Sequence, residues 1–187
     1  MCVFGVADKH LQLLEPGPAG NAANAETIEA MWECLFTDQM INLIVDNTNL
    51  KIEQECLSLV AEERQQTYHH HTDTIEIRAY IGILYYSILW KSADVDVNRL
   101  WSTTNGLTIY KCVFPRLRFT FLSTCLRFDN KDEREEDDRF SPIRNFWNMF
   151  IENCKSNYSP SHECTVDEQL LSFRGCCKFR NSGLYER

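Results

Sequence analysis

Two consecutive acids, Asp167 and Glu168, lie inside an apolar run from Val166 to Phe173 that is typical of a β-strand. Successive residues of a strand point to opposite faces, so at least one of these carboxylates is directed inward or lines a cleft. A buried carboxylate is costly unless it is paired or bound to a metal ion. The pair is therefore a candidate metal-binding position, and chance placement on an edge strand is the alternative.

A second candidate is a basic stretch. Lys111, Arg116, Arg118 and Arg127 lie between positions 111 and 127, where no acidic residue occurs and aromatic residues are interleaved. Arg116 and Arg127 are eleven residues apart, a separation that returns to the same face of a helix after about three turns. The pattern predicts a helix that contacts the phosphates of a nucleic acid. An ordinary helix with a basic exposed side is the alternative.

Three other clusters, of histidines, cysteines and acids, lack the spacing of a metal-binding site. The histidine run 69–71 cannot direct all its rings to one ion on a regular element, so we expect a solvated turn. Cys164, Cys176, Cys177 and His162 do not have zinc-finger spacing, and we expect free thiols. The acids between positions 132 and 138 lack the ligand alternation and central glycine of a calcium loop, which indicates a solvated charged loop.

The charge is distributed unevenly over the 187 residues, whose formal net charge is -8. Residues 1–100 carry 6 basic and 15 acidic side chains, whereas residues 101–187 carry 13 basic and 12 acidic ones. This distribution excludes a uniformly basic nucleic-acid-binding protein but is compatible with a local basic surface in the second half.

Cysteine usage and hydropathy indicate an intracellular, soluble protein. The nine cysteines are odd in number and contain no Cys-x-x-Cys pair, unlike a secreted disulfide framework. The longest uncharged apolar stretch, Ala79 to Trp90, is well short of the roughly 20 residues that span a bilayer. The N-terminus lacks the basic region and apolar length of a signal peptide. We expect no membrane partner.

The elements that position these residues are predicted to be mainly helical. Residues 1–25 are rich in Pro, Gly, Asn and Ala and indicate a flexible lead-in. The first clear helix is predicted near Thr37, and a more polar one over Glu53–Gln66. Pro115 can open another helix. A clean amphipathic helix is predicted from Ser141 to just before Pro160.

The helix expected at the centre of the core begins at Asp73 or Thr74. Asp73 and Glu76 have the spacing of a capping box. The apolar residues of this helix predict a wide buried face, consisting of Ile77, Tyr80, Ile81, Leu84, Tyr85, Ile88 and Leu89. After position 164 the pattern changes to two short strands, which predicts a β-hairpin at the C-terminal end of a helical body.

Several segments together resemble the piggyBac family of transposases over roughly residues 35–180. The resemblance lies in the following segments, which occur in the order and with the spacing of the family: Thr74–Leu84, Trp101–Thr103, Arg116–Phe119, Leu126–Asn130, Asp138–Arg144 and Thr165–Gly175. The last of these looks like the strand that bears the family's first catalytic aspartate.

The resemblance implies an RNase H-like catalytic domain in which three aspartates hold two Mg²⁺ ions for DNA strand cleavage and transfer. Only Asp167 maps onto that triad. The expected organisation is a flexible lead-in over 1–34, a helical segment over 35–160 like the family's dimerisation and DNA-binding domain, and the first strands of an incomplete RNase H-like α/β domain over 161–187. In this interpretation Lys111, Arg116, Arg118 and Arg127 contact DNA.

The prediction is a truncated, nuclear, transposable element-derived protein that is not catalytic by itself, because one carboxylate cannot place two divalent ions. No cofactor is expected in this chain, and Mg²⁺ belongs to the full-length family. The expected partners are DNA, bound weakly, and a second copy or a full-length transposase. One alternative is a non-enzymatic module that binds DNA or a transposase, and another is a partly folded, unused product.

Overall fold

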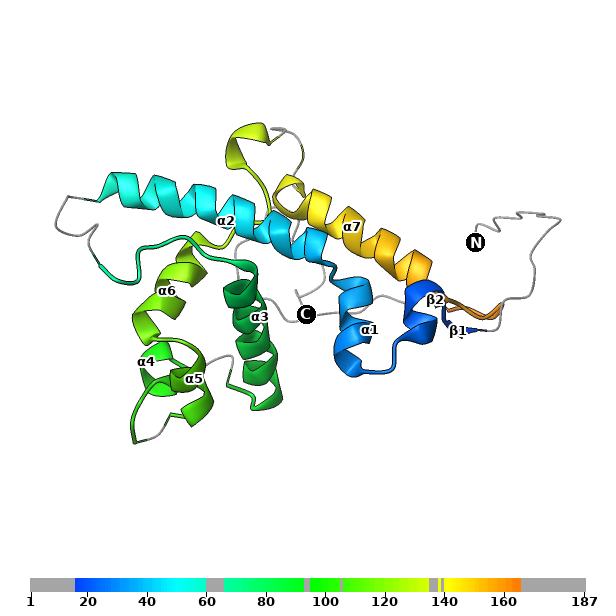
Figure 1. Ribbon diagram of the computed structural model, residues 1–187, viewed down its shortest axis with the longest axis horizontal. Coiled ribbons are helices and arrows are strands. Elements are labelled where there is room, and N and C mark those ends of the chain that lie inside the picture. Colours follow the sequence, from blue (N-terminus) through cyan, green and yellow to red (C-terminus); the bar gives the residue numbers. More distant parts are fainter. Residues whose placement is uncertain are drawn as a thin grey trace, which may run out of the picture. The chain divides into compact units, whose positions relative to one another are not determined.

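The computed structural model describes residues 16–59, 66–92, 95–104, 106–134, 138 and 140–165 (Figure 1). The chain forms two compact units. Unit 1 consists of Met1–Phe36 and Phe150–Cys177, and unit 2 of Thr37–Met149 and Lys178–Arg187. Most of the described residues are helical, which confirms the prediction of a mainly α-helical chain.

Unit 1 joins the beginning of the described chain to its end. Its elements are β1 (Gly17–Pro18), the 3-10 helix η1 (Gly20–Asn24), α1 (Ile28–Leu35), the last part of α7 (Ser141–Asn157) and β2 (Tyr158–Ser159). The two strands are antiparallel, with Gly17 opposite Ser159. The buried side chain of Asn157 accepts from the amide of Ala22 (3.2 Å) and donates to the carbonyl of Cys34 (3.1 Å). One amide side chain therefore holds η1, α1 and α7 together.

Helix α1 was not predicted from the sequence, because the first helix was expected near Thr37. The hydroxyl of Thr27 caps it by accepting from the amide of Ala30 at 3.1 Å. Phe36, which ends the helix, lies against Trp32 and Phe150 with ring centroids 4.9 and 5.3 Å away. An eight-residue helix is marginal in isolation, so these aromatic contacts stabilise it.

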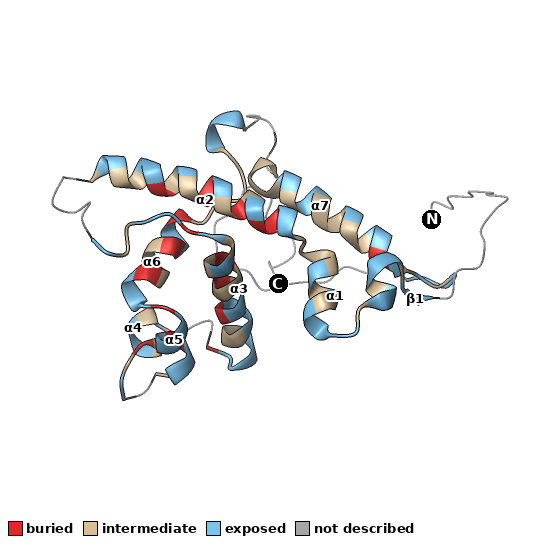
Figure 2. Cartoon of the chain, viewed as in Figure 1, coloured by how far each residue is buried: buried red, intermediate tan, exposed pale blue. Residues whose placement is uncertain are grey.

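All the regular elements that the structure describes in unit 2 are helices. It contains α2 (Asp38–Ser58), α3 (Thr74–Leu89), α4 (Val97–Leu100), α5 (Thr108–Val113), α6 (Arg116–Cys125), the 3-10 helix η3 (Lys131–Glu133) and the first part of α7. Helix α2 packs against α3 and α6. Figure 2 shows the buried residues along these three helices. Helix α2 is continuous, whereas two helices were predicted over the same region.

The core of unit 2 has an aliphatic and an aromatic part. The aliphatic part lies between α2, α3 and α6 and is built from Met40, Ile41, Ile44, Ile52, Ile77, Ile83 and Leu122. In the aromatic part, the ring of Trp101 lies 5.0 Å from that of Tyr110 and 4.8 Å from that of Phe119. The indole Nε1 of Trp101 donates to the carbonyl of Phe114 at 2.8 Å, which fixes the chain where α5 turns into α6.

Helix α3 begins where the sequence predicted, but the side chains that it buries differ from the predicted ones. The carboxylate of Asp73 accepts from the amide of Glu76 at 2.8 Å, which confirms the predicted cap. Ile77, Tyr80 and Ile83 are buried. The wide buried face predicted for the second half of the helix is wrong, because Leu84, Tyr85, Ile88 and Leu89 are exposed.

The predicted C-terminal hairpin and Asp167 lie outside the described residues, so the domain division that rests on them stays a prediction. Helix α7 begins at Ser141, as the Ser-Pro pair predicts, and ends at Asn157, before the second Ser-Pro pair. In the part of the chain that the structure describes, no helix is long and apolar enough to cross a membrane.

Candidate nucleic-acid interface

The structure divides the four predicted DNA-contacting residues of the basic stretch among α5, α6 and the segment that follows α6. Lys111 lies on α5, and Arg116 and Arg118 lie on α6. Helix α6 ends at Cys125, so Arg127 lies beyond it. The expectation that Arg116 and Arg127 share one helical face is therefore wrong, because an eleven-residue separation implies a shared face only within a continuous helix.

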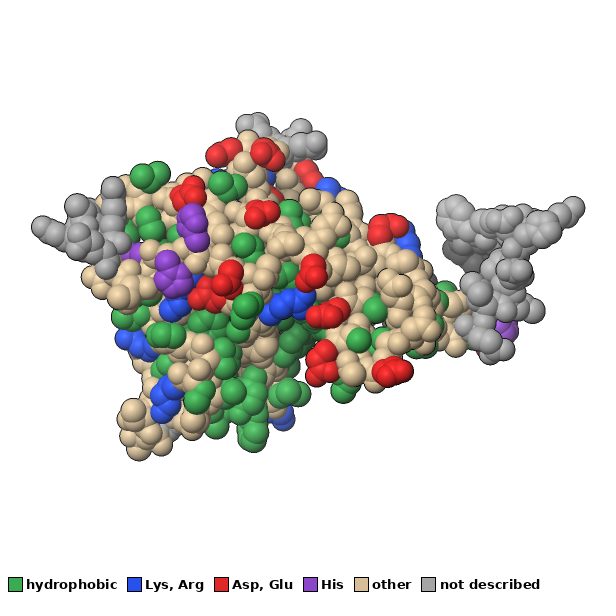
Figure 3. Space-filling model, viewed as in Figure 1, with side chains coloured by type: hydrophobic (Ala, Val, Ile, Leu, Met, Phe, Trp, Pro, Cys, Tyr) green, Lys and Arg blue, Asp and Glu red, His purple; other side chains and the backbone are tan. Residues whose placement is uncertain are grey.

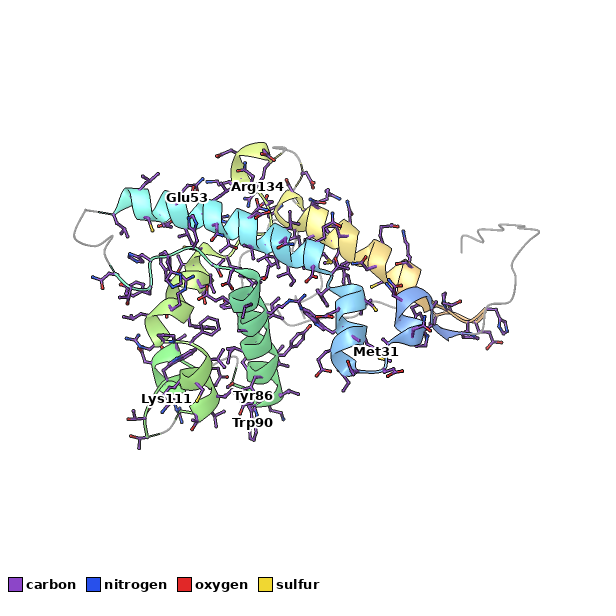
Figure 4. All side chains as sticks on the ribbon, viewed as in Figure 1. Met31, Glu53, Tyr86, Trp90, Lys111 and Arg134 are labelled. Atoms are coloured by element: carbon purple, nitrogen blue, oxygen red, sulfur yellow. The ribbon has the colours of Figure 1, made fainter. Side chains whose placement is uncertain are left out.

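The corner between α5 and α6 presents Lys111 and Arg116. Phe114 and Pro115 separate the two helices, and Phe114 is buried. Proline has no backbone N–H to leave unsatisfied at a helix start, so Pro115 begins α6 without loss of a hydrogen bond. Because the buried ring and the Trp101 hydrogen bond fix the corner, Lys111 and Arg116 extend from a rigid support. Figure 4 shows Lys111 on α5, to the left of Trp90 at the end of α3.

Both of these cations are exposed and donate to neutral acceptors. The Nζ of Lys111 lies 3.2 Å from the carbonyl of Ser102, and a guanidinium N–H of Arg116 donates to Oδ1 of Asn98 at 2.8 Å. Neutral acceptors orient the side chains but do not cancel their charge. Among the described residues neither cation is in an ion pair, so the arrangement can bind an anion such as a phosphate without first breaking one.

Arg118 requires a correction, because it is buried rather than available to DNA. Only 3% of the residue is exposed. Its guanidinium donates to the carboxylate of Glu76 at 2.7 and 2.5 Å. It also donates to the carbonyls of Tyr68 and His70 (both 2.8 Å) and of His71 (3.3 Å). Arg118 therefore holds the segment before α3 against α6 and contacts no phosphate in this fold.

Glu76 completes this arrangement, which we call the Arg118 hub (Arg118, Glu76 and the carbonyls of residues 68, 70 and 71). The hydroxyl of Thr72 donates to Glu76 at 2.6 Å. Burial disfavours the charged carboxylate, but the hydrogen bonds from Arg118 and Thr72 outweigh it, and the pKa of Glu76 lies below its ordinary value. The amide of Thr72 donates in turn to Oδ1 of Asn49 on α2 at 2.7 Å.

A groove of about 700 Å³ lies between this segment and the α5–α6 corner. The segment 67–79 forms one wall and residues 113–118 form the other. Arg116 lies at the groove together with His70 and His71, and Ile75 and Leu117 give it an apolar part. The groove thus extends the basic corner, and its acids Glu76 and Asp73 are engaged with Arg118 and with the α3 cap respectively.

Arg127 is half-buried, and its backbone anchors the end of α6. Its amide donates to Oγ1 of Thr48 at 3.2 Å, and the same hydroxyl lies 3.4 Å from its carbonyl. The backbone position of Arg127 is therefore fixed by α2.

The three histidines of the 69–71 run have separate surroundings, as expected for a turn. The ring of His69 lies 4.5 Å from those of Tyr68 and Phe121. The Nε2 of His71 lies 3.1 Å from a carboxylate oxygen of Glu53, and His70 is exposed. Among the described residues, no three His, Cys, Asp or Glu side chains are grouped to hold a metal ion.

The acidic loop contains two ion pairs that the sequence did not indicate. Arg134 donates to both carboxylate oxygens of Asp129, at 2.6 and 2.7 Å. Asp138 pairs with Arg144, and the hydrogen bonds from Arg144 lower the pKa of Asp138 to about 2. Cys164 is an exposed free thiol, as expected, while Cys176 and Cys177 lie outside the described residues.

Comparison with known proteins identifies the class. The chain belongs to the family of transposases described as Transposase IS4, which matches residues 29–182. It is also similar to a solved structure, "Cryo-EM structure of piggyBac transposase synaptic complex with hairpin DNA (SNHP)". The TM-score is 0.80 and the sequence identity 35%, over 90% of this chain and 35% of that chain.

The predicted resemblance to piggyBac transposases is thus confirmed. The chain spans about a third of the length of that solved transposase. No curated protein matches the chain.

Proposed function

We propose that this chain takes part in DNA transposition as a DNA-contacting helical part of a piggyBac-type transposase. The observation that carries the proposal is the similarity, at a TM-score of 0.80, to a transposase that was solved with hairpin DNA. The family match over residues 29–182 supports the same role.

In this proposal the DNA backbone lies along the α5–α6 corner. Lys111 and Arg116 contact phosphates, and Arg127 adds charge near the end of α6. The support is the exposure of Lys111 and Arg116 and the neutral character of their present acceptors. Because the formal net charge of the chain is -8, binding is expected to be weak and to depend strongly on salt.

A gel-shift titration tests this interface with a labelled duplex DNA that ends in a hairpin, at about 50 and 200 mM salt. We expect Lys111→Gln and Arg116→Gln each to weaken binding and to reduce the slope of log affinity against log salt by about 0.9. Lys131→Gln is the matched control, because Lys131 is exposed on η3, beside Arg134, which lies far from Lys111 in Figure 4. Absence of binding at low salt, or equal loss in the control, would refute the interface.

For catalysis, we propose that Asp167 is a metal-binding aspartate of the family's active site and that these 187 residues alone do not cut DNA. Of the family's three aspartates, Asp167 is the one with a counterpart in this sequence, and two Mg²⁺ ions require more carboxylates than one. The family match extends through position 167. We therefore expect no strand cleavage by the purified chain with Mg²⁺. Cleavage that disappears in Asp167→Ala would contradict this expectation.

The proposed partners are DNA and a transposase chain, either a second copy of this chain or a full-length relative. The support is that the similar structure is a synaptic complex. A role in transposition also implies a nuclear location.

A further inference from the structure

Two residues of the histidine run, His70 and His71, line the groove beside the α5–α6 corner together with Arg116. Histidine is the side chain that ordinarily changes its charge between about pH 5 and 8. A histidine next to a phosphate-binding arginine therefore makes an anion site sensitive to pH. Figure 3 shows histidine side chains close to Lys or Arg side chains on one face of unit 2, over the segment that leads into α3.

The three histidines differ in what surrounds their rings. The ring of His69 lies against two aromatic rings. The Nε2 of His71 lies 3.1 Å from a carboxylate oxygen of Glu53, so a proton on His71 is matched by a negative charge. His70 is exposed, and in the part of the chain that the structure describes it takes part in no ion pair. His70 is therefore the histidine whose positive charge is available to a ligand.

The hydrogen bond of His70 decides which ring nitrogen takes up the proton. Its Nδ1 lies 2.7 Å from the carbonyl oxygen of His71. A carbonyl oxygen only accepts, so Nδ1 carries the hydrogen in the neutral ring and Nε2 is the nitrogen that gains a proton. The neutral ring presents a lone pair at Nε2, which a phosphate oxygen cannot bind. The cationic ring presents an N–H and a positive charge, which a phosphate accepts.

The fixed charges of the groove are balanced, so a proton on His70 gives it a net positive charge. The ionisable side chains that line the groove with His70 are Tyr68, His71, Asp73, Glu76, Arg116 and Arg118. They include two carboxylates and two guanidinium groups. Glu76 is bound to Arg118, and Asp73 caps α3. Neither acid therefore has to release His70 before it binds an anion.

We propose that His70 is a further phosphate contact of the DNA interface, which acts when its ring is protonated and strengthens binding at mildly acidic pH. This rests on the proposed function, because it extends the interface from Arg116 into the groove. If the protonated ring releases one more counterion, affinity increases up to about 15-fold at 50 mM salt and about 4-fold at 200 mM salt. The slope of log affinity against log salt steepens by about 0.9.

The gel-shift titration with the hairpin duplex, repeated at pH 8 and pH 6 and at both salt concentrations, tests the proposal. We expect the wild type to bind more tightly at pH 6, and His70→Gln to keep the pH 8 affinity at both pH values. The substitution leaves the backbone carbonyl of His70 in place to accept from Arg118. His71→Gln is the matched control, because Glu53 already balances that imidazole, and it is expected to retain the pH dependence.

Two more variants separate the contact from general effects of pH and folding. His70→Arg carries a permanent charge and is expected to bind at pH 8 at least as tightly as the wild type at pH 6. His162→Gln removes an exposed histidine of unit 1 and controls for the overall change in charge between the two pH values. Circular dichroism at pH 8 and 6 verifies that each variant is folded.

The results distinguish this proposal from the proposed function. Binding that changes less than about twofold between pH 8 and 6, or that changes equally in the wild type and His70→Gln, would refute the role of His70 and leave the α5–α6 interface standing. An equal loss of pH dependence in His71→Gln would also refute it. Binding that requires His70 but neither Lys111 nor Arg116 would support the His70 contact and refute the α5–α6 interface. Absence of binding at both pH values would refute both.

Discussion

Replacing Arg118 with methionine removes a guanidinium whose five N–H groups are all used. Two of its hydrogen bonds go to Glu76, and three go to backbone carbonyls of residues 68, 70 and 71. Methionine has a similar length and can fill the space, but it donates no hydrogen bond. The variant therefore leaves the carboxylate of Glu76 without its cation and three carbonyls without their donor.

The expected cost is large. Breaking a buried ion pair by removing one partner costs about 3–5 kcal/mol, because the remaining charge stays buried. Glu76 is partly accessible, with 19% of its side chain exposed, so water can hydrate the unpaired carboxylate and recover part of the lost stability. We therefore expect a loss of about 3 kcal/mol in the free energy of unfolding. A protein domain has only about 5–15 kcal/mol in total.

Urea unfolding followed by circular dichroism measures this loss. Arg116→Met is the control, because Arg116 is the exposed arginine two positions away and its loss is expected to cost less than about 0.5 kcal/mol. The double variant Arg118→Met, Glu76→Leu removes the orphaned carboxylate and is expected to recover at least 1 kcal/mol, since apolar replacements of buried pairs are often tolerated. An Arg118→Met protein within 1 kcal/mol of the wild type would refute the structural role of the hub.

Three further predictions concern the same unit. The pKa of Glu76 is lowered in the folded protein, so its ion pair stabilises the fold above the ordinary carboxyl pKa, and this contribution is lost as the pH falls through the folded value. In urea unfolding between pH 7 and 3, the free energy of unfolding is therefore expected to fall less steeply with pH in Glu76→Gln than in the wild type. Asp73→Ala is expected to cost about 1 kcal/mol through loss of the α3 cap, whereas Asp73→Asn costs only tenths, and equal effects in urea unfolding would contradict the capping role. Burial raises the pKa of the Cys125 thiol to about 11, so this thiol is expected to react slowly at neutral pH. Peptide mapping after brief alkylation is expected to show labelled Cys112 and Cys164 in the native protein, and labelled Cys125 only in urea. Labelling of Cys125 in the native protein would contradict its burial.

Local signals in the sequence predicted the starts of two helices correctly. The Asp73–Glu76 spacing identified the start of α3 because a cap is formed within one helical turn. The Ser141-Pro142 pair identified the start of α7, because proline is tolerated in the first turn of a helix. A comparable signal, Thr27 three residues before Ala30, was available for α1 and was overlooked among the Gly- and Pro-rich residues before it.

Long-range features could not be read from the residues. Nothing near Arg118 in the sequence indicates its partner Glu76, which lies 42 residues earlier. The exposed Arg116 and the buried Arg118 therefore looked equivalent as DNA contacts. Periodicity also shows that α3 is apolar on more than one side but not which side faces this chain's core, so Ile83 and Leu89 could not be distinguished. The role of Asp167 stays a prediction, because it lies outside the described residues.

The Arg118 hub also bears on how unit 2 folds. Its members are separated by 42 to 50 residues, so the hub closes a long loop and forms only after α3 and α6 have come together. We therefore expect the hub to form after the folding transition state, and the loss of contacts that form so late mainly accelerates unfolding. In stopped-flow experiments, Arg118→Met is therefore expected to refold at nearly the wild-type rate and to unfold much faster. The residue that looked like a contact for DNA thus determines how long the folded unit lasts.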